Sequence, residues 1–350
     1  MKDAVNQGVF PGGVLLVSRE NNILFHQAFG HTDSNKDKPV TTQTLYDLAS
    51  LTKPLATTMA VMKLVENLQV NLDDRLDRFL DISKDTDKAG ITIRHLLMHS
   101  SGLPDYCPYF KIHSQTSSSE WRTMLLKWIV REPLVQPPGE TNCYSDLGFM
   151  LLRGVIETVT GSRLDQWVQT EIYQPIQLMD LCFLPLEQSY AAERIAPTEN
   201  CTWRGVLVQG HVHDENAYAA GGVDGQAGLF GTATAIHCLL LKLFDCYVGQ
   251  SALKMFPQSL IRAFFDCGTE TERPLGFDRP ATQKSAAGRL FSKSSVGHLG
   301  FTGTSFWMDL ARSIIVVLLS NRIHPTRDNE RIKDFRPMIH DEIMSVLGFS

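Results

Sequence analysis

The sequence predicts an α+β fold in which an antiparallel sheet, flanked by helices, receives strands from both ends of the chain. Apolar, β-rich runs lie near both termini, while the region between them has helical periodicity. With 43% hydrophobic and 20% charged residues among 350, the chain has ample apolar material for a core. The simplest packing of this pattern is one sheet assembled from both termini and covered by helices.

The strands are expected as two hairpin pairs. Residues 14–18 and 23–29 are apolar and rich in strand-forming residues, and the two asparagines at 21–22 signal a hairpin turn between them. Residues 304–308 and 313–320 form the second pair, separated by a short polar turn. We therefore expect the N-terminal and C-terminal hairpins to share one sheet.

The helices are expected in the middle of the chain and at its C-terminal end. Apolar residues recur there with the period of an amphipathic helix, and clusters of proline, glycine and serine separate the periodic segments. The loops are placed at 100–104 and 137–139, and the helices at 54–69, 93–99, 119–131, 146–160, 164–172 and 328–347.

Charge and composition exclude several kinds of partner. The formal net charge is −5, and no run of five or more basic residues occurs. Binding to nucleic acid requires a basic stripe that neutralises phosphates, so we expect no nucleic-acid partner. The longest apolar runs have the length of strands, so we also expect no membrane span.

The compartment is predicted from the first residues and from the cysteines. The chain reaches its first predicted strand without a long apolar stretch and a cleavage site, so no signal peptide is recognised. Seven cysteines lack paired or metal-binding spacing, which favours free thiols in a reducing compartment. We expect a cytoplasmic protein, or a periplasmic one if a leader has been trimmed from this chain.

The pattern Ser-x-x-Lys is the first candidate for catalysis. It occurs twice, at Ser50–Lys53 and at 251–254, although a chain with 24 serines and 14 lysines is expected to contain it by chance about once. Ser50 follows a strand-like segment at 45–48 and precedes the helix at 54–69. Positions i and i+3 share one helix face, which brings an amine within reach of the hydroxyl, as an activated serine requires.

The sequence around each of the two Ser-x-x-Lys matches decides between them. Pro54 restricts the backbone of Lys53, but a proline is tolerated in the first turn of a helix because its missing N–H has no helical partner. Ser251, in contrast, follows a glycine and a glutamine and is interpreted as a helix N-cap, with Lys254 in solvent. Ser50 is therefore the better nucleophile candidate.

Three further segments, in order along the chain, resemble the motifs of one enzyme family. Residues 95–104 (His-Leu-Leu-Met-His-Ser-Ser-Gly-Leu-Pro), Tyr144-Ser145-Asp146 and His298-Leu299-Gly300 resemble segments of class C β-lactamases and their esterase and peptidase relatives. The last two stand where that family has Tyr-x-Asn and Lys-Thr-Gly or His-x-Gly. The segment 213–217 (His-Asp-Glu-Asn-Ala) is similar to a branch of penicillin-binding-protein-like hydrolases.

The resemblance covers nearly the whole chain and implies a fold of the β-lactamase/DD-peptidase kind. An antiparallel sheet flanked by helices would form one domain from residues 1–55 and 205–350. A mainly helical second domain would span residues 56–204. The active site would lie in the cleft between the two domains.

The same resemblance implies roles for individual residues. Ser50 would be acylated, Lys53 would act as its base, and Tyr144 would pass a proton to the leaving group. The backbone N–H groups of Ser50 and of Phe301, the residue after Gly300, would hold the oxyanion. Removal of one such donor typically costs ~10²–10³ in rate.

Two residues depart from the family pattern. Asp146 replaces an asparagine whose amide can donate to a substrate carbonyl, whereas a carboxylate can only accept. His298 replaces a lysine, so the group expected to meet a substrate carboxylate is only partly charged at neutral pH. We therefore expect an esterase or peptidase for small esters, amides or peptides. An efficient β-lactamase or a D-alanyl-D-alanine carboxypeptidase is the alternative.

Other interpretations of these residues stay open at this point. Tyr144, Asp146 and His298 are each common as structural residues. A family member that has lost catalysis and serves as a binding module is a further alternative, although the presence of Ser50, Lys53 and Tyr144 speaks against it. His95 and His99 have the i, i+4 spacing of a zinc motif, but the glutamate that would follow the first histidine is a leucine. His211 and His213 alternate as strand ligands do. We expect neither a metal nor another cofactor.

Overall fold

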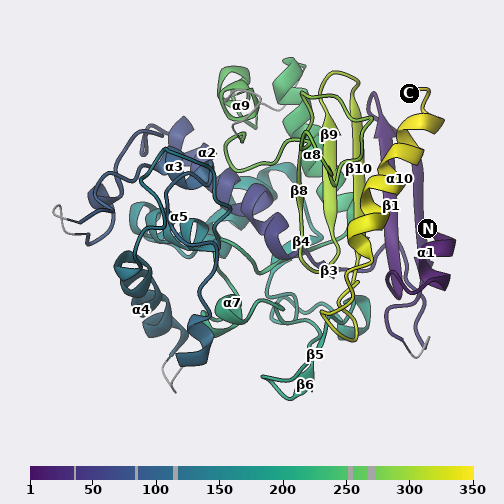
Figure 1. Ribbon diagram of the computed structural model, residues 1–350, viewed down its shortest axis with the longest axis horizontal. Helices are drawn as coiled ribbons and strands as arrows, with labels where there is room; N and C mark the ends of the chain where they lie inside the picture. Colours follow the sequence, from purple (N-terminus) through teal and green to yellow (C-terminus); the bar gives the residue numbers. More distant parts are fainter. Residues whose placement is uncertain (35–36, 83–85, 113–116, 251–254, 267–272) are drawn as a thin grey trace.

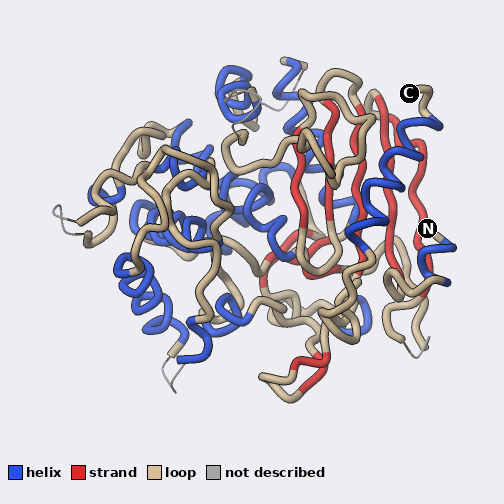
Figure 2. The backbone as a smooth tube through the Cα atoms, in the orientation of Figure 1, coloured by secondary structure: helices blue, strands red, loops and turns tan. Residues whose placement is uncertain are grey.

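The computed structural model describes residues 1–34, 37–82, 86–112, 117–250, 255–266 and 273–350. It confirms the predicted α+β class, because strands and helices both contribute large parts of the fold. The strands gather on one side of the molecule and a group of helices on the other (Figure 2). The second Ser-x-x-Lys match, at 251–254, lies outside the described residues.

The main sheet has five strands in the order β2-β1-β10-β9-β8, and it confirms the expected joining of both ends of the chain (Figure 1). Every pairing in it is antiparallel. The N-terminal hairpin and the C-terminal hairpin meet where β1 pairs with β10. The strands are β1 (Gly12–Arg19), β2 (Asn22–Gly30), β8 (Val296–Leu299), β9 (Ser305–Asp309) and β10 (Ile314–Ser320).

Alternation along β1 and β10 divides the core into two layers. Val14, Leu16, Val317 and Leu319 belong to the large core that continues into α8 (Ala233–Val248). The intervening residues point to the opposite face, which α10 (Ile332–Val346) and α1 (Lys2–Asn6) cover. Successive side chains of a strand point to opposite faces of the sheet. A strand that is covered on both faces therefore has apolar residues at consecutive positions.

The helix-rich region contains the predicted helices with small shifts of their ends. Only the helix at 146–160 keeps its predicted bounds. The segments predicted as helices at 54–69 and 164–172 each contain a wider π-helical part. Pro54 is the second residue of the first of these parts. The elements are π Lys53–Thr58, α2 (Met59–Glu66), α3 (Ile93–Leu97), α4 (Ser118–Arg131), α5 (Asp146–Thr160), α6 (Leu164–Val168) and π Gln169–Tyr173.

Smaller elements connect the sheet with the helices. A three-stranded sheet in the order β3-β7-β4 leads directly into the segment that carries Ser50. A short hairpin of β5 and β6 extends from the body of the protein (Figure 1). These elements are β3 (Tyr46–Asp47), β4 (Leu181–Phe183), β5 (Asn200–Cys201), β6 (Val206–Leu207), β7 (Leu229–Gly231), α7 (Glu215–Ala219), α9 (Gln258–Phe265) and 3-10 helices at Ala49–Leu51, Leu76–Arg78, Tyr109–Ile112, Gln174–Ile176 and Ala192–Arg194.

Two further expectations concern membranes and cysteines. In the described ranges, no helix has both the length and the apolar character needed to cross a bilayer. The six described cysteines are free thiols. Cys267 lies outside the described residues.

A buried ion pair fixes α5 against the loop that precedes β7. Arg153 on α5 donates from Nε to Asp224 Oδ1 at 2.8 Å, and the two side chains are 2% and 0% exposed. Its Nη1 also donates to Glu157 Oε2 at 2.9 Å. The next residue in the loop, Gly225, accepts a hydrogen bond from Thr57 at 2.7 Å. The middle of α5 and the helix after Ser50 are therefore tied to one loop.

We expect Arg153→Met to lower the free energy of unfolding by about 3–5 kcal/mol, because it leaves Asp224 buried without its cation. Urea denaturation would measure the change. Arg163→Met provides a matched control, since its ion pair with Asp165 is 37% exposed on the arginine side. That loss should stay below about 1 kcal/mol. Equal losses in the two variants would contradict a structural role for the buried pair.

Candidate active site

Ser50 lies in a tight turn between β3 and the following helix. Asp47, at the end of β3, is buried and accepts the N–H of Ala49 at 2.8 Å and the N–H of His213 at 2.6 Å. Ala49 has a left-handed backbone with φ of 48°, which an alanine adopts only when its surroundings enforce it. The fixed turn leaves the Ser50 side chain partly exposed in a cavity.

Lys53 lies directly behind the serine and is completely buried. Its Nζ is 3.0 Å from Ser50 Oγ, as the i, i+3 spacing predicts. The same nitrogen lies 2.7 Å from Asp146 Oδ1 and 3.3 Å from the carbonyl oxygen of Gln226. The Lys53 side chain is 0% exposed, so these groups provide its polar surroundings.

The Lys53–Asp146 distance determines the charge of the lysine. Burial opposes a charged amine, but the carboxylate of Asp146 and the hydroxyl of Tyr144 outweigh it and raise the pKa of Lys53. The amine is therefore protonated at neutral pH and donates to Ser50. Before it can accept the serine proton, it must first lose one of its own.

Tyr144 completes this group of side chains. Its ring centroid lies 4.9 Å from Lys53 Nζ. Burial raises the pKa of the Tyr144 hydroxyl, while hydrogen bonds with Lys53 and Ser50 act in the opposite direction. The ring stacks on His99 at a centroid distance of 4.4 Å. The structure thus brings Ser50, Lys53, Tyr144 and Asp146 together, as the motif order predicts.

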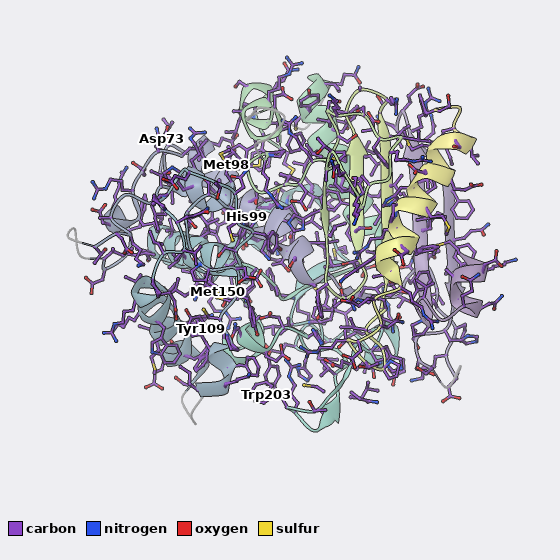
Figure 3. All side chains as sticks on the ribbon, viewed as in Figure 1. Asp73, Met98, His99, Tyr109, Met150 and Trp203 are labelled. Atoms are coloured by element: carbon purple, nitrogen blue, oxygen red, sulfur yellow. The ribbon has the colours of Figure 1, made fainter. Side chains whose placement is uncertain are left out.

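His99 supports the loop that carries Tyr144. Its Nδ1 accepts the N–H of Ser145 at 2.9 Å, and Ser145 Oγ donates to the carbonyl of Pro104 at 2.6 Å. Burial, followed by nearby cations, lowers the pKa of His99 well below its usual value, so the ring is neutral. In Figure 3, His99 lies on the part of the helix-rich region that is nearest to the main sheet.

His298 lies on β8 with its ring centroid 6.1 Å from that of Tyr144, and it is buried behind the residues that line the cavity. The ring is 2% exposed, and its Nδ1 lies 2.9 Å from the carbonyl oxygen of Leu299. Burial lowers the pKa of His298 to about 4, although Asp278 acts in the opposite direction. The sequence predicts a partly charged imidazole here, whereas its burial makes it neutral at pH 7.

The loop after β8 is fixed directly to the serine turn. Thr302 Oγ1 donates to the carbonyl of Asp47 at 2.7 Å, and Thr304 Oγ1 donates to the carbonyl of Leu48 at 3.1 Å. A Cβ at Gly300 would lie 2.0 Å from Thr304 Oγ1 and 2.6 Å from the Leu48 carbonyl, so only glycine fits. This contact places Phe301 on the wall of the same cavity as Ser50.

The cavity around Ser50 has a volume of about 380 Å³ and a strongly acidic wall. Four carboxylates line it, and among its described residues the one lining cation is Arg327, which lies 2.6 Å from Glu199 and 2.5 Å from Glu215. The lining residues are Ala49, Ser50, Asp105, Tyr106, Tyr144, Asp146, His213, Asp214, Glu215, Gln226, Ala227, Phe301 and Arg327.

Several of these residues are not identified by the sequence motifs. Asp214 and Glu215 belong to the segment 213–217, where the sequence suggests only a branch resemblance and a metal alternative. Gln226 comes from the loop that precedes β7, and Arg327 comes from the loop that precedes α10. The one signal available is the run of two acidic residues after His213.

The histidine pairs do not form metal sites among the described residues. No group of three or more potential metal ligands occurs in those ranges. His213 Nε2 lies 2.7 Å from Glu199 Oε2, and the His213 ring stacks on Phe301. His211 lines a separate cavity with Trp203. His95 accepts a hydrogen bond from the N–H of Thr92.

Comparison with known sequences gives one consistent result. The family model described as Beta-lactamase matches residues 1–336. A protein of Escherichia coli (strain K12), provisionally named D-alanyl-D-alanine carboxypeptidase, is 34% identical over 92% of this chain and 81% of its own length. The N-acetylmuramyl-L-alanine amidase of Bacillus subtilis (strain 168) is 30% identical over 92% of this chain and 79% of its own length.

Solved structures share the fold at lower sequence identity. EstCE1, described as a hydrolase with promiscuous acyltransferase activity, superposes with a TM-score of 0.72 at 21% identity, covering 96% of each chain. The octameric penicillin-binding protein homologue from Pyrococcus abyssi superposes with a TM-score of 0.71 at 19% identity. That match covers 96% of this chain and 75% of the homologue.

We expect the His298 ring to stay neutral between about pH 5.5 and 8, unlike a solvated imidazole. Carbon–proton NMR of the histidine rings would follow its signal with pH, and the His298→Gln variant would assign that signal. Free imidazole in the same sample provides the reference titration. A His298 signal that follows this reference would contradict the lowered pKa.

Proposed function

This chain belongs to the Beta-lactamase family of serine hydrolases, and on that premise we propose that it cleaves esters or amides through an acyl-enzyme formed on Ser50. One observation carries the proposal. Lys53 Nζ lies 3.0 Å from Ser50 Oγ and 2.7 Å from Asp146 Oδ1, in the wall of a cavity large enough for a small substrate.

In the proposed mechanism, Lys53 and Tyr144 divide the proton transfers. Ser50 Oγ attacks the substrate carbonyl carbon and gives its proton to the free-amine form of Lys53. When the tetrahedral intermediate collapses, the leaving group takes a proton from the Tyr144 hydroxyl, which Lys53 then restores. Water attacks the acyl-enzyme by the reverse path and releases the acid. Because Asp146 favours the protonated lysine, the reactive free-amine form of Lys53 becomes more abundant as the pH rises.

The oxyanion is assigned to the backbone N–H groups of Ser50 and Phe301. The hydrogen bonds from Thr302 and Thr304 to the serine turn support this assignment, because they hold the two segments in fixed register. In the described part of the chain, no hydrogen-bond acceptor pairs with the Phe301 N–H. A donor fixed before the reaction begins stabilises developing charge without reorganisation.

The charges around the cavity favour substrates that lack a carboxylate. Lys53 is paired with Asp146, and Arg327 with Glu199 and Glu215, while His298 is neutral. A substrate carboxylate would therefore meet neutral or negative groups. We propose simple esters, and peptides or amides with a free amine, in preference to penicillins or to the peptide substrates named for the carboxypeptidase relative.

We expect Ser50→Ala to abolish hydrolysis of short-chain nitrophenyl esters, because the variant cannot form the acyl-enzyme. Ser251→Ala should retain nearly full activity. A fluorophosphonate should label the wild type covalently and should fail to label Ser50→Ala. Ester hydrolysis that survives in Ser50→Ala would overturn the assignment.

The three proposed catalytic groups should also lose activity non-additively. Because Lys53 and Tyr144 act only through the nucleophile Ser50, removing Lys53 or Tyr144 from Ser50→Ala should cost little more. Kinetics of the single and double variants would show this. Additive losses would assign the groups to separate steps.

We expect Asp146→Asn to shift the rise of kcat/KM with pH, which follows the deprotonation of Lys53, towards neutral pH. The carboxylate raises the pKa of Lys53, so its removal increases the fraction of free amine at any given pH. An opposite charge at this range typically shifts a pKa by about 1–3 units. Ester hydrolysis followed between pH 6 and 10, roughly the span of such a rise, would measure the shift, with Ser50→Ala correcting for spontaneous hydrolysis.

The same variant should improve acylation by nitrocefin, since an asparagine amide can donate to a β-lactam side-chain carbonyl. Two results would sink this idea. One is efficient nitrocefin hydrolysis by the wild type. The other is an Asp146→Asn variant that keeps both the pH profile and the substrate preference of the wild type.

A further inference from the structure

Asp214 is one of two carboxylates in the cavity wall that have no ion pair among the described residues. Its Oδ1 accepts the N–H of Ala217 at 2.7 Å, which caps the short helix α7, and Gln226 Nε2 at 3.2 Å. The other, Asp105, is exposed, whereas Asp146 is paired with Lys53 and Glu215 with Arg327. Asp214 therefore carries an acceptor oxygen that these contacts leave unused.

Gln226, which lines the same cavity, carries a second unused acceptor. The residue is 1% exposed, and its Nε2 is committed to Asp214. Its Oε1 is buried and has no hydrogen-bond donor among the described groups. A buried acceptor without a donor costs free energy that a ligand carrying a donor recovers. Gln226 thus points to a ligand that donates hydrogen bonds.

The surroundings of Asp214 select a positively charged donor. Desolvation raises the pKa of Asp214 to about 7, and the nearby Asp146 and Glu215 carboxylates add to the rise. A group with an excess of negative neighbours gains most from a cation. A primary ammonium offers three donors and no acceptor, which matches a wall of carboxylate and amide oxygens.

Gln226 also links Asp214 to the proposed nucleophile. Its carbonyl oxygen lies 3.3 Å from Lys53 Nζ, and Lys53 Nζ lies 3.0 Å from Ser50 Oγ. One residue therefore contacts Asp214 through its side chain and the Ser50–Lys53 pair through its backbone. A substrate held at Asp214 would have its ammonium group a few bonds from the scissile carbonyl.

We propose that Asp214 and Gln226 form a subsite for the ammonium group of an α-aminoacyl substrate, so that the enzyme prefers amides and esters of amino acids with a free amine. This inference rests on the proposed function, in which Ser50 attacks a carbonyl in the same cavity. It adds to that function the chemical group that selects the substrate.

The test compares alanine p-nitroanilide, in both enantiomers, with its N-acetyl derivative. The wild type should prefer the free-amine substrate. Asp214→Asn keeps the shape and the helix cap, since asparagine is also a good N-cap. It should lower the ratio of kcat/KM values, free amine over N-acetyl, by roughly 10- to 100-fold, mainly through KM. Asp105→Asn, which removes a carboxylate from the exposed rim of the same cavity, should leave this ratio near the wild-type value.

A measurement on the wild type covers the case in which Asp214→Asn does not fold. Alaninamide should inhibit nitrophenyl ester hydrolysis at lower concentration than N-acetylalaninamide does. A wild type that does not distinguish the two amides, or an Asp214→Asn variant with an unchanged ratio, would overturn the subsite. If fluorophosphonate fails to label Ser50, the proposed function itself fails; if Ser50 is labelled and the amine preference is absent, only the subsite fails.

Discussion

The buried ammonium group of Lys53 is the constraint on which the arrangement of this protein depends. A charge removed from water costs several kcal/mol unless partners surround it. Three separate parts of the chain supply those partners, namely the serine turn, the first residue of α5 and the loop before β7. The Arg153–Asp224 pair fixes the last two against each other from behind. The position of Ser50 therefore follows from a charge balance that spans the helix-rich region and the adjoining loops.

The acidic character of the cavity unites several properties that look separate. Burial is the main cause of the raised pKa of Asp214 and opposes the raised pKa of Lys53, but the negative charge of Asp146 raises the pKa of both groups. The neutrality of His298 comes from burial, which there outweighs the attraction of Asp278. Together they give a cavity that accepts cations and hydrogen-bond donors more readily than anions. Relatives with the same backbone can therefore differ in substrate through a few side chains.

The sequence was sufficient for four strands of the main sheet, for six helical segments and for the Ser50–Lys53 contact, whereas β8 and α8 were not predicted. Apolar runs and hairpin signals identify β1, β2, β9 and β10, and the i, i+3 spacing identifies the Ser50–Lys53 contact. Both predictions succeed because they depend only on residues that are close together in the sequence. The left-handed turn at Ala49 and the π-helical turn after Lys53 were not predicted. Tertiary contacts enforce the first, and the second is a local widening of the helix around Pro54. Asp214 and Gln226 reach the cavity only through long-range packing, which no spacing encodes.

The pairing of β1 with β10 has a consequence for how the chain acquires its structure. Gly13 lies opposite Ser320, so the centre of the sheet joins segments separated by almost the whole sequence. During synthesis, the first hairpin has one side of its sheet unfilled until the last strands leave the ribosome. Closing so long a loop is entropically costly, and contacts of this kind slow folding. An apolar strand edge stays exposed meanwhile and can pair with other chains, so folding at low concentration or with a chaperone should raise the yield of native protein.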